Sequence, residues 1–289
     1  MKTRLTRVVI FGDAKKGHVT KAIRDFTDFV KGRAEIIANC GIEQCTPDIL
    51  KNCDFAVVFG GDGSIISAAR SLSRSNVPVI GVNLGKLGFL AEFGVDELKE
   101  VFSDIVSGKA PIEKRMMLNC SILGNKQEKF CAEAVNDIFI TAGAPFRTVE
   151  LKISVDGQPL AGCVGDGLII STPTGSTAYN LSAGGPILSA NMEAMVVTPI
   201  CPHSLSFRPI VIHADSKVEV IGICLNEGTT ISIDGQVSCK FSSSDVVHIE
   251  RQGSDFLVVH NPFRTQWDTL ATKLSWAEKP RYKETPFSF

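Results

Sequence analysis

The sequence lacks the features that mark several large classes of protein. Its 30 basic and 31 acidic residues nearly cancel, so the chain as a whole has no charge that attracts nucleic acid or an anionic membrane. No apolar run approaches the ~18 residues that span a bilayer, and the residues after Met1 do not form the apolar stretch of a signal peptide. We therefore expect a cytoplasmic protein with no nucleic-acid and no membrane partner.

Signatures of metal sites and of two common nucleotide sites are also missing. The nine cysteines include no Cys-x-x-Cys pair, and no group of His, Cys and carboxylates has the spacing of metal ligands. The chain contains neither the dinucleotide fingerprint Gly-x-Gly-x-x-Gly nor the Gly-Lys-Ser/Thr of a P-loop. We predict no disulfide framework and no metal site built from the protein, and a hydride-transfer function loses its main sequence support.

The first part of the chain alternates short apolar runs with stretches of helical periodicity. Strands are expected at residues 5–11, 34–38, 54–59 and 77–82, and helices at residues 19–30, 64–73 and 95–107. Short apolar strands that alternate with helices indicate a parallel sheet covered on both faces. We predict a Rossmann-like, doubly wound α/β domain over residues 1–110.

Beyond residue 110, strand-like runs follow one another with few helical stretches between them. The expected strands are residues 118–123, 130–134, 137–141, 149–155, 168–171, 218–223, 229–233 and 246–250. This pattern predicts an all-β domain, a β-sandwich, over residues 111–262. Residues 263–289 begin with a helix-like segment that has nothing to pack on alone, so we expect this C-terminal tail to return to the first domain.

The most informative motif is Gly60-Gly61-Asp62-Gly63, which follows an apolar strand and precedes a helix. A glycine turn at the carboxyl end of a parallel strand places backbone N–H groups at a phosphate. An acid inside that turn should repel phosphate unless it binds a cation or accepts a proton from an attacking hydroxyl. The motif therefore points to phosphoryl transfer, although a glycine turn capped by Asp and Ser would look similar.

A second block, Ser-Thr-Pro-Thr-Gly-Ser-Thr-Ala-Tyr over residues 171–179, is rich in hydroxyl groups and follows another apolar strand. Its composition suits contacts to phosphate or sugar, although Pro173 and Gly175 also fit an ordinary turn. Three shorter motifs, Asn136-Asp137, Asp166-Gly167 and Asp234-Gly235-Gln236, are on their own most simply turns. The last of them is predicted to be a type I′ hairpin turn.

Together, these motifs resemble those of bacterial NAD kinases. Gly60-Gly-Asp-Gly63, Asn83-x-Gly-x-Leu-Gly-Phe-Leu90, Asn136-Asp137, Asp166-Gly167 and Thr172-Pro-Thr-Gly-Ser-Thr-Ala-Tyr179 occur in that family's order and approximate spacing. The resemblance implies transfer of the γ-phosphoryl group of ATP to the 2′-hydroxyl of the adenosine ribose of NAD, with Mg²⁺ or another divalent cation accompanying ATP. It also implies a homodimer or homotetramer.

The resemblance further implies roles for individual residues. Asp62 would be the general base that accepts the hydroxyl proton, and Gly63 would lie close to the same ribose. The other expected contacts to the dinucleotide are Asn136, Asp137, Arg147, Asp166, Thr177, Ala178, Tyr179, Ser182 and Gln236. Some members have an arginine where this chain has Val164, so a contact made by that arginine is not carried over.

The implied chemistry is consistent with the residues present. A ribose hydroxyl is a poor nucleophile, and a positioned carboxylate contributes roughly 10²–10⁴-fold by removing its proton. Two alternatives stay open: a diacylglycerol-type lipid kinase, which shares the Gly-Gly-Asp-Gly loop, and a non-catalytic NAD or NADP sensor. The sequence has no basic amphipathic helix to bind a membrane, and the presence of Asp62 argues against a sensor.

Overall fold

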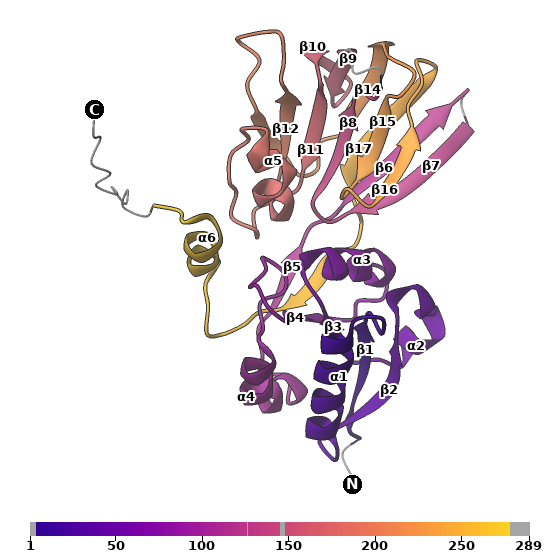
Figure 1. Cartoon of the computed structure of the whole chain (residues 1–289). Coiled ribbons are helices and arrows are strands. Elements are labelled where there is room, and N and C mark those ends of the chain that lie inside the picture. The colour runs from indigo at the N-terminus through magenta and orange to yellow at the C-terminus, as the bar shows by residue number, and fades with distance from the viewer. Residues whose placement is uncertain (1–3, 126, 145–147, 278–289) are drawn as a thin grey trace, which may run out of the picture.

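The computed structural model describes residues 4–125, 127–144 and 148–277, which form an α/β part and an all-β part (Figure 1). The α/β part contains a six-stranded sheet of order β2-β1-β3-β4-β18-β5. Its strands are β1 (Thr6–Gly12), β2 (Ala34–Cys40), β3 (Phe55–Phe59), β4 (Val79–Val82), β5 (Ile112–Arg115) and β18 (Phe256–Val259). Neighbouring strands pair in parallel except β5, which pairs antiparallel with β18.

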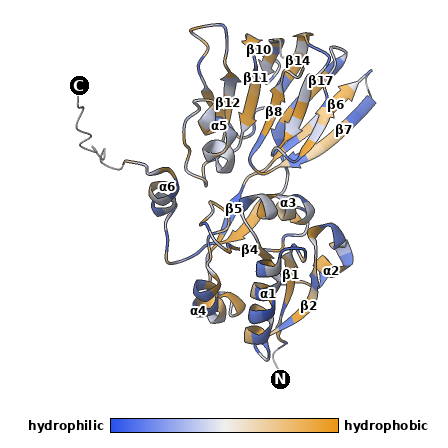
Figure 2. Ribbon diagram, in the orientation of Figure 1, coloured by the Kyte–Doolittle hydropathy of each residue, from blue (hydrophilic) through white to orange (hydrophobic). Residues whose placement is uncertain are grey.

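Helices cover both faces of this sheet. They are α1 (Gly17–Val30), η1 (Ile42–Gln44), α2 (Pro47–Lys51), α3 (Asp62–Leu72) and α4 (Val95–Val106). Successive side chains of a strand point to opposite faces, so Val8 of β1 packs in the core beneath α1 and α4, and Val9 packs in the core beneath α3. Both hydrophilic and hydrophobic colours appear on α1 and α4 in Figure 2, as expected of helices with one buried face. The doubly wound α/β domain is confirmed.

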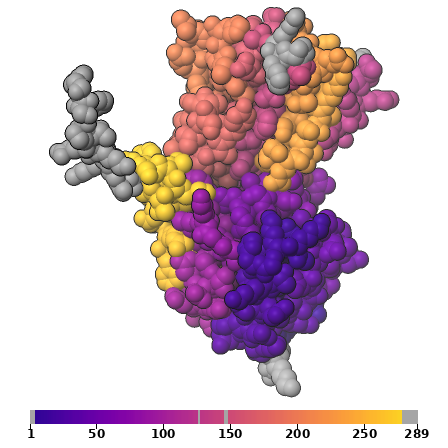
Figure 3. Space-filling model, in the orientation of Figure 1, coloured from indigo at the N-terminus to yellow at the C-terminus, as the bar shows by residue number. Residues whose placement is uncertain are grey.

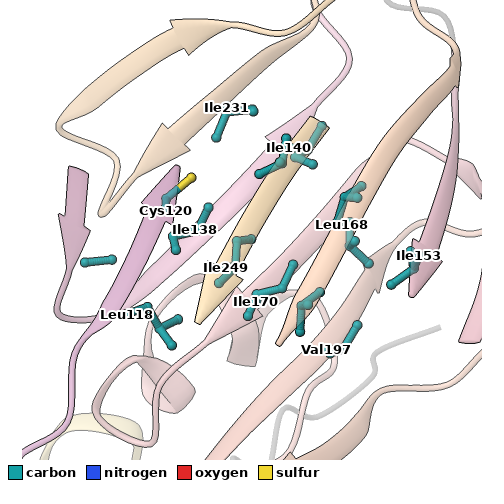
Figure 4. Close-up of a cluster of buried hydrophobic side chains, with 14 of the residues drawn as sticks. Leu118, Cys120, Ile138, Ile140, Ile153, Leu168, Ile170, Val197, Ile231 and Ile249 are labelled. Carbon is teal, nitrogen blue, oxygen red and sulfur yellow. The ribbon is translucent and has the colours of Figure 1, made fainter. Parts of the chain in front are cut away.

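The all-β part consists of two antiparallel sheets that pack face to face. Their orders are β10-β9-β14-β17-β6-β7 and β13-β12-β11-β8-β15-β16. The strands are β6 (Leu118–Gly124), β7 (Gln127–Ala134), β8 (Asp137–Thr141), β9 (Val149–Val155), β10 (Gln158–Gly165), β11 (Gly167–Ser171), β12 (Ala194–Ile200), β13 (Ile210–His213), β14 (Val218–Cys224), β15 (Thr230–Ile233), β16 (Val237–Lys240) and β17 (Asp245–Arg251). Inward side chains of both sheets, such as Ile140 and Ile249, form one apolar core, which confirms the β-sandwich (Figure 4).

Two strands within residues 111–262, the expected all-β domain, belong to the six-stranded sheet of the α/β part. β18 pairs with β4 between Val258 and Val79, and it also pairs with β5 along its whole length. The chain therefore leaves the first sheet after Arg115 and returns to it at Phe256, rather than dividing at residues 110 and 262. Neither β5 nor β18 was expected from the sequence, and a local pattern does not reveal which sheet a strand will join.

Four further strands, β10, β12, β13 and β16, were not expected from the sequence. Proline explains two of these omissions, because Pro159 in β10 and Pro199 in β12 interrupt runs that otherwise have strand character. The predicted hairpin turn between β15 and β16 is present. Asp234 and Gly235 both have positive φ, 53° and 65°, as a type I′ turn requires.

The helix expected from residue 64 begins two residues earlier, at Asp62. Gly61 is its extended N-cap, so Asp62 and Gly63 belong to the first turn of α3 and the tight turn is confined to Gly60 and Gly61. An acidic side chain is favoured there, because the N-terminal end of a helix carries a partial positive charge. The consequence is that Asp62 is held by a regular helix rather than by a loop.

The final helix, α6 (Gln266–Leu274), lies on the side of the molecule where the two parts meet (Figure 3). Arg264, just before α6, pairs with Glu97 of α4, and Gln266 donates a hydrogen bond of 3.0 Å to Ser189 of the all-β part. The described portion of the tail thus contacts both parts. None of the helices described is long and apolar enough to cross a membrane.

Candidate functional site

The Asp62 carboxylate accepts hydrogen bonds from three consecutive backbone amides of the loop after β4. Phe89 N donates to Oδ2 at 3.0 Å, and Leu90 N and Ala91 N donate to Oδ1 at 2.9 and 3.0 Å. The loop comes so close at Gly88 that a Cβ there would lie 2.0 Å from Asp62 Oδ1. Glycine at this position of the Asn83–Leu90 motif therefore allows the loop to close around the carboxylate.

These contacts keep Asp62 ionised. Burial acts to raise its pKa, but the amides of Leu90, Ala91 and Phe89 and the ammonium of Lys273 together lower the pKa below its ordinary value. The Lys273 ammonium belongs to α6 and lies 3.3 Å from Asp62 Oδ2. The side chain of Asp62 is 27% exposed, so it remains within reach of a ligand.

A second buried carboxylate, Asp234, fixes the Asn136-Asp137 segment. Asp234 is in the β15–β16 turn, and its fully buried side chain accepts from Val135 N (3.1 Å), Asn136 N (2.8 Å) and Asp137 N (3.2 Å). Arg70 of α3 completes the arrangement with an ion pair of 3.1 Å. The turn predicted from Asp234-Gly235 thus also binds the neighbouring segment, which the dipeptide alone did not reveal.

The same hairpin joins the all-β part to the glycine motif. Gln236 Nε2 donates to the carbonyl oxygen of Gly63 at 2.9 Å, and Gln236 Oε1 accepts from Arg70 Nη2 at 2.5 Å. Arg70 therefore contacts both Asp234 and Gln236, and this hairpin holds the start of α3 against the sandwich.

Asp137 is a buried acid with an unused oxygen. It is 3% exposed, and its Oδ2 has no hydrogen-bond partner among the described residues. Burial and the nearby charge of Asp234 raise its pKa to about 7, against the effect of the Tyr179 backbone N–H, which lowers it. A buried polar atom without a partner is uncommon in native proteins and often marks a position that a ligand completes.

The hydroxyl-rich block packs directly against this segment. It forms η2 (Thr174–Thr177) and α5 (Tyr179–Ser182). Thr172 N donates to the carbonyl oxygen of Asn136 at 2.8 Å, and a Cβ on Gly175 would lie 2.0 Å from that same oxygen. The fold therefore brings together the expected residues Asn136, Asp137, Thr177, Ala178 and Tyr179.

The other expected residues lie around this group. Tyr179 is 37% exposed and meets Phe139 edge to face, with ring centroids 5.0 Å apart. Asp166 and Ser182 are exposed. Burial raises the pKa of the Tyr179 phenol most, and the charges of Cys201 and then Asp166 raise it further. The Val164 side chain is also exposed. Arg147 lies outside the described residues.

A cavity of about 610 Å³ opens at the carboxyl ends of β1 and β3. Its wall includes Gly63 and Gln236, together with Gly12, Asp13, Ala14, Lys15, Gly41, Glu43, Gln44 and Ser64. Residues 12–15 and 41–44 were not expected at the site. The Gly12-Asp13 turn at the end of β1 was a usable signal, because ligands of open α/β sheets bind at the carboxyl ends of the strands.

Comparison with known proteins agrees with this two-domain kinase architecture. Residues 14–110 match the ATP-NAD kinase N-terminal domain, and residues 135–261 match the ATP-NAD kinase C-terminal domain. The NAD kinase of Geobacter sulfurreducens is 43% identical over 232 residues, which cover 80% of this chain and 82% of that protein. The NAD kinase of Thiobacillus denitrificans is 37% identical over 269 residues, covering 89% and 92%.

Solved structures show the same fold. Yeast NADH kinase complexed with NADH superposes with a TM-score of 0.85 at 27% identity, covering 98% of this chain and 91% of that one. An NAD kinase from Archaeoglobus fulgidus in complex with ATP gives a TM-score of 0.76 at 25% identity, covering 94% and 99%. The protein is therefore an enzyme of the kinase class. The chain belongs to the NAD kinase family.

Proposed function

We propose that the protein transfers the γ-phosphoryl group of ATP to the 2′-hydroxyl of the adenosine ribose of NAD, with Asp62 as the general base. The observation that carries this proposal is an ionised, partly exposed carboxylate held by three amides at the start of α3. The similarity to NAD kinases that the comparisons establish supports the choice of substrates.

The dinucleotide would bind where the hydroxyl-rich block meets the Asn136-Asp137 segment. Asn136, Asp137, Thr177 and Ala178 lie together there, and the exposed ring of Tyr179 offers a face for stacking. Gly63 and Gln236 connect this region to Asp62 through their mutual hydrogen bond. Asp166, Ser182 and Arg147 are proposed as further contacts on the strength of the sequence resemblance.

ATP would occupy the cavity at the ends of β1 and β3. Its volume of about 610 Å³ falls within the ~300–1,000 Å³ typical of small-molecule sites. Gly63 and Ser64 present the first turn of α3 to this space, and the positive end of a helix favours a phosphate. Lys15 lines the same wall and is a cationic residue of the cavity.

A divalent cation, Mg²⁺ in the simplest case, would arrive with ATP and neutralise charge on its phosphates. Mg²⁺ is usually bound by substrate phosphates with one or two carboxylates, and Asp13 and Glu43 are carboxylates of the cavity wall. These two residues are therefore proposed to hold the cation. The Asp62 carboxylate keeps its separate task of accepting the hydroxyl proton, worth roughly 10²–10⁴-fold or about 3–5 kcal/mol of barrier.

The decisive measurement is NADP formation from NAD, ATP and Mg²⁺ by the wild type and by Asp62→Asn. We expect turnover by the wild type and at least a hundredfold loss in the variant, with NAD binding retained. Turnover that survives the substitution would remove Asp62 from its role while keeping the reaction. No turnover with any phosphoryl donor despite tight NAD binding would instead support a sensor.

Three further points need separate measurements. Sedimentation with lipid vesicles tests the lipid-kinase alternative, which requires binding to a membrane or to its lipids. Light scattering of the purified protein tests the proposed homodimer or homotetramer. A cytoplasmic location is proposed on the sequence alone and is tested by fractionation of cells.

A further inference from the structure

Lys273 reaches the site from a part of the chain that follows both family domains. The match to the C-terminal domain ends at residue 261, and Lys273 is in the last turn of α6. Its ammonium donates a hydrogen bond of 3.3 Å to Asp62 Oδ2 and lies 4.7 Å from the centre of the Phe89 ring. A cation between a carboxylate and an aromatic face is held by both.

The helix that carries Lys273 is firmly placed. A capping box between Thr265 and Asp268 fixes its first turn, and Leu270 is only 4% exposed. Leu270 lines a small pocket together with Phe89 of the Asp62 loop and Thr177 of the hydroxyl-rich block. The position of Lys273 therefore follows from packing that also involves the proposed substrate site.

The contacts of Asp62 leave no acceptor position for a substrate. A carboxylate has about four lone-pair positions, two on each oxygen. Oδ1 receives Leu90 N and Ala91 N, and Oδ2 receives Phe89 N and Lys273 Nζ. The three amides belong to the backbone and are fixed by the loop, whereas the lysine side chain is 29% exposed and flexible. A hydroxyl that approaches Asp62 must therefore replace Lys273.

We propose that Lys273 is a further residue of the reaction: its ammonium occupies on Asp62 the position that the ribose hydroxyl takes when NAD binds, and it then moves toward the transferring phosphoryl group. The inference rests on the proposed function. In that reaction the hydroxyl oxygen forms the new bond to the γ-phosphorus, the bond from this phosphorus to the ADP oxygen breaks, and the hydroxyl proton passes to Asp62. Lys273 stays protonated throughout and stabilises the charge on the phosphoryl oxygens.

The exchange predicts opposite effects on binding and on turnover when the ammonium is removed. Lys273→Met vacates the acceptor position, so NAD should bind at least as tightly as to the wild type. The same variant loses a cation beside the phosphoryl group, so kcat should fall about 10–100-fold, the scale of one hydrogen bond to a charged group. Lys273→Arg keeps a cation and should retain part of that kcat.

The experiment compares wild type, Lys273→Met, Lys273→Arg and Lys51→Met. Lys51 is a matched control because its side chain is 74% exposed and it pairs with Asp48 on α2, away from Asp62. Calorimetry gives the affinity for NAD and for its 2′-deoxyadenosine analogue, steady-state assays give kcat and KM, and thermal unfolding checks that each variant is folded. The preference for NAD over the deoxy analogue should be larger in Lys273→Met than in the wild type.

Several results would overturn the inference. Wild-type kcat in Lys273→Met would show that the ammonium takes no part. An equal preference for NAD over the deoxy analogue in both proteins would show that no exchange occurs. An equal loss of kcat in Lys51→Met would show that removing any surface positive charge has this effect, so that Lys273 has no specific role. If the wild type itself forms no NADP, the proposed function fails. The exchange is still tested in that case, by the affinities of wild type and Lys273→Met for NAD and for its deoxy analogue.

Discussion

At the scale of single residues, the site contains two acids of the same type in opposite environments. Asp62 is surrounded by hydrogen-bond donors, which lower its pKa, whereas burial and the charge of Asp234 raise the pKa of Asp137 to about 7. Environments that separate the pKa values of two carboxylates allow one to act as a base while the other can carry a proton at neutral pH. Asp62 suits the first task, and Asp137 can offer a proton to a ligand.

The environment of Asp137 predicts how the stability of the free enzyme depends on pH. Its pKa is higher in the folded state than in the unfolded chain, so stability is lost as pH rises from about 4 to about 7. Asp137→Asn stays neutral and keeps an acceptor for the Tyr179 N–H. The variant should therefore exceed the wild type in unfolding free energy by about 2–4 kcal/mol at pH 8.

Urea unfolding at several pH values between 4 and 8 measures this difference, which should shrink toward pH 4. Asp166→Asn is the matched control, because Asp166 is exposed and its substitution should change stability little at any pH. Equal stability of Asp137→Asn and wild type at pH 8 would mean that the buried acid is stabilised in its charged form.

At the scale of elements, the β15–β16 hairpin connects the two parts through Arg70. The Arg70 side chain is 17% exposed and Asp234 is fully buried, so removing the cation leaves a buried carboxylate without its ion pair. Breaking a buried pair in this way costs about 3–5 kcal/mol. Arg70→Met should therefore lower the unfolding free energy by that amount and weaken NAD binding, because Asp234 also fixes Asn136 and Asp137.

Arg74→Met provides the comparison for the hairpin. Arg74 also pairs with a glutamate of the all-β part, Glu133, but its side chain is 80% exposed. The Glu133 side chain is only 9% exposed, but it also accepts hydrogen bonds from Ser73 Oγ and Gln252 Nε2, and the Arg74 guanidinium is screened by water. This variant should therefore lose less unfolding free energy than Arg70→Met and should bind NAD as the wild type does. Chemical unfolding and calorimetry separate the two variants, and similar losses in both would contradict a special role for Arg70.

The elements themselves were largely predictable, because their patterns are local. Val19, Ile23, Phe26 and Val30 of α1 recur at helical spacing and all four are buried, so a short stretch of sequence contains the whole signal. The Asp234-Gly235 turn was equally clear. Pro199 obscured β12, because proline usually excludes a residue run from the interior of a sheet.

The contacts of the site were less predictable, because they join distant residues. The Asn83–Leu90 loop could be expected near Asp62, since both follow neighbouring parallel strands. Lys273 is 211 positions from Asp62, and no local pattern connects a lysine on an amphipathic helix to one carboxylate. The resemblance to a family pointed to Asp62 as the proposed base, whereas the fold was needed to find the groups that contact its carboxylate.

At the scale of the whole molecule, the chain crosses between its parts through β5 and β18, and a buried ionic network lies where it crosses. Glu92 accepts from Asn261 N at 2.9 Å and from His260 Nδ1 at 3.0 Å, and Arg115 lies 3.8 Å away. Arg264 donates to the Glu92 carbonyl oxygen at 2.7 Å. The same glutamate therefore holds both the end of β18 and the segment that leads into α6.

The protonation of His260 should therefore affect the stability of the whole fold. The hydrogen bond with Glu92 raises its pKa, burial opposes this, and the charges of Glu92 and Glu113 raise it further while Arg115 lowers it. A histidine whose pKa is raised in the folded state contributes stability that is fully present below pH ~6.5 and is lost as pH rises through the folded-state pKa. His260→Gln, which does not titrate, should lack this contribution, so the stability gap between wild type and variant should be largest at pH 6 and smallest at pH 9.

The control is His248→Gln, because His248 is 41% exposed and lies 3.7 Å from an exposed glutamate, Glu219. Thermal unfolding across this pH range measures both gaps, and a gap for His260→Gln that stays constant with pH would mean that the histidine acts here by packing rather than by charge.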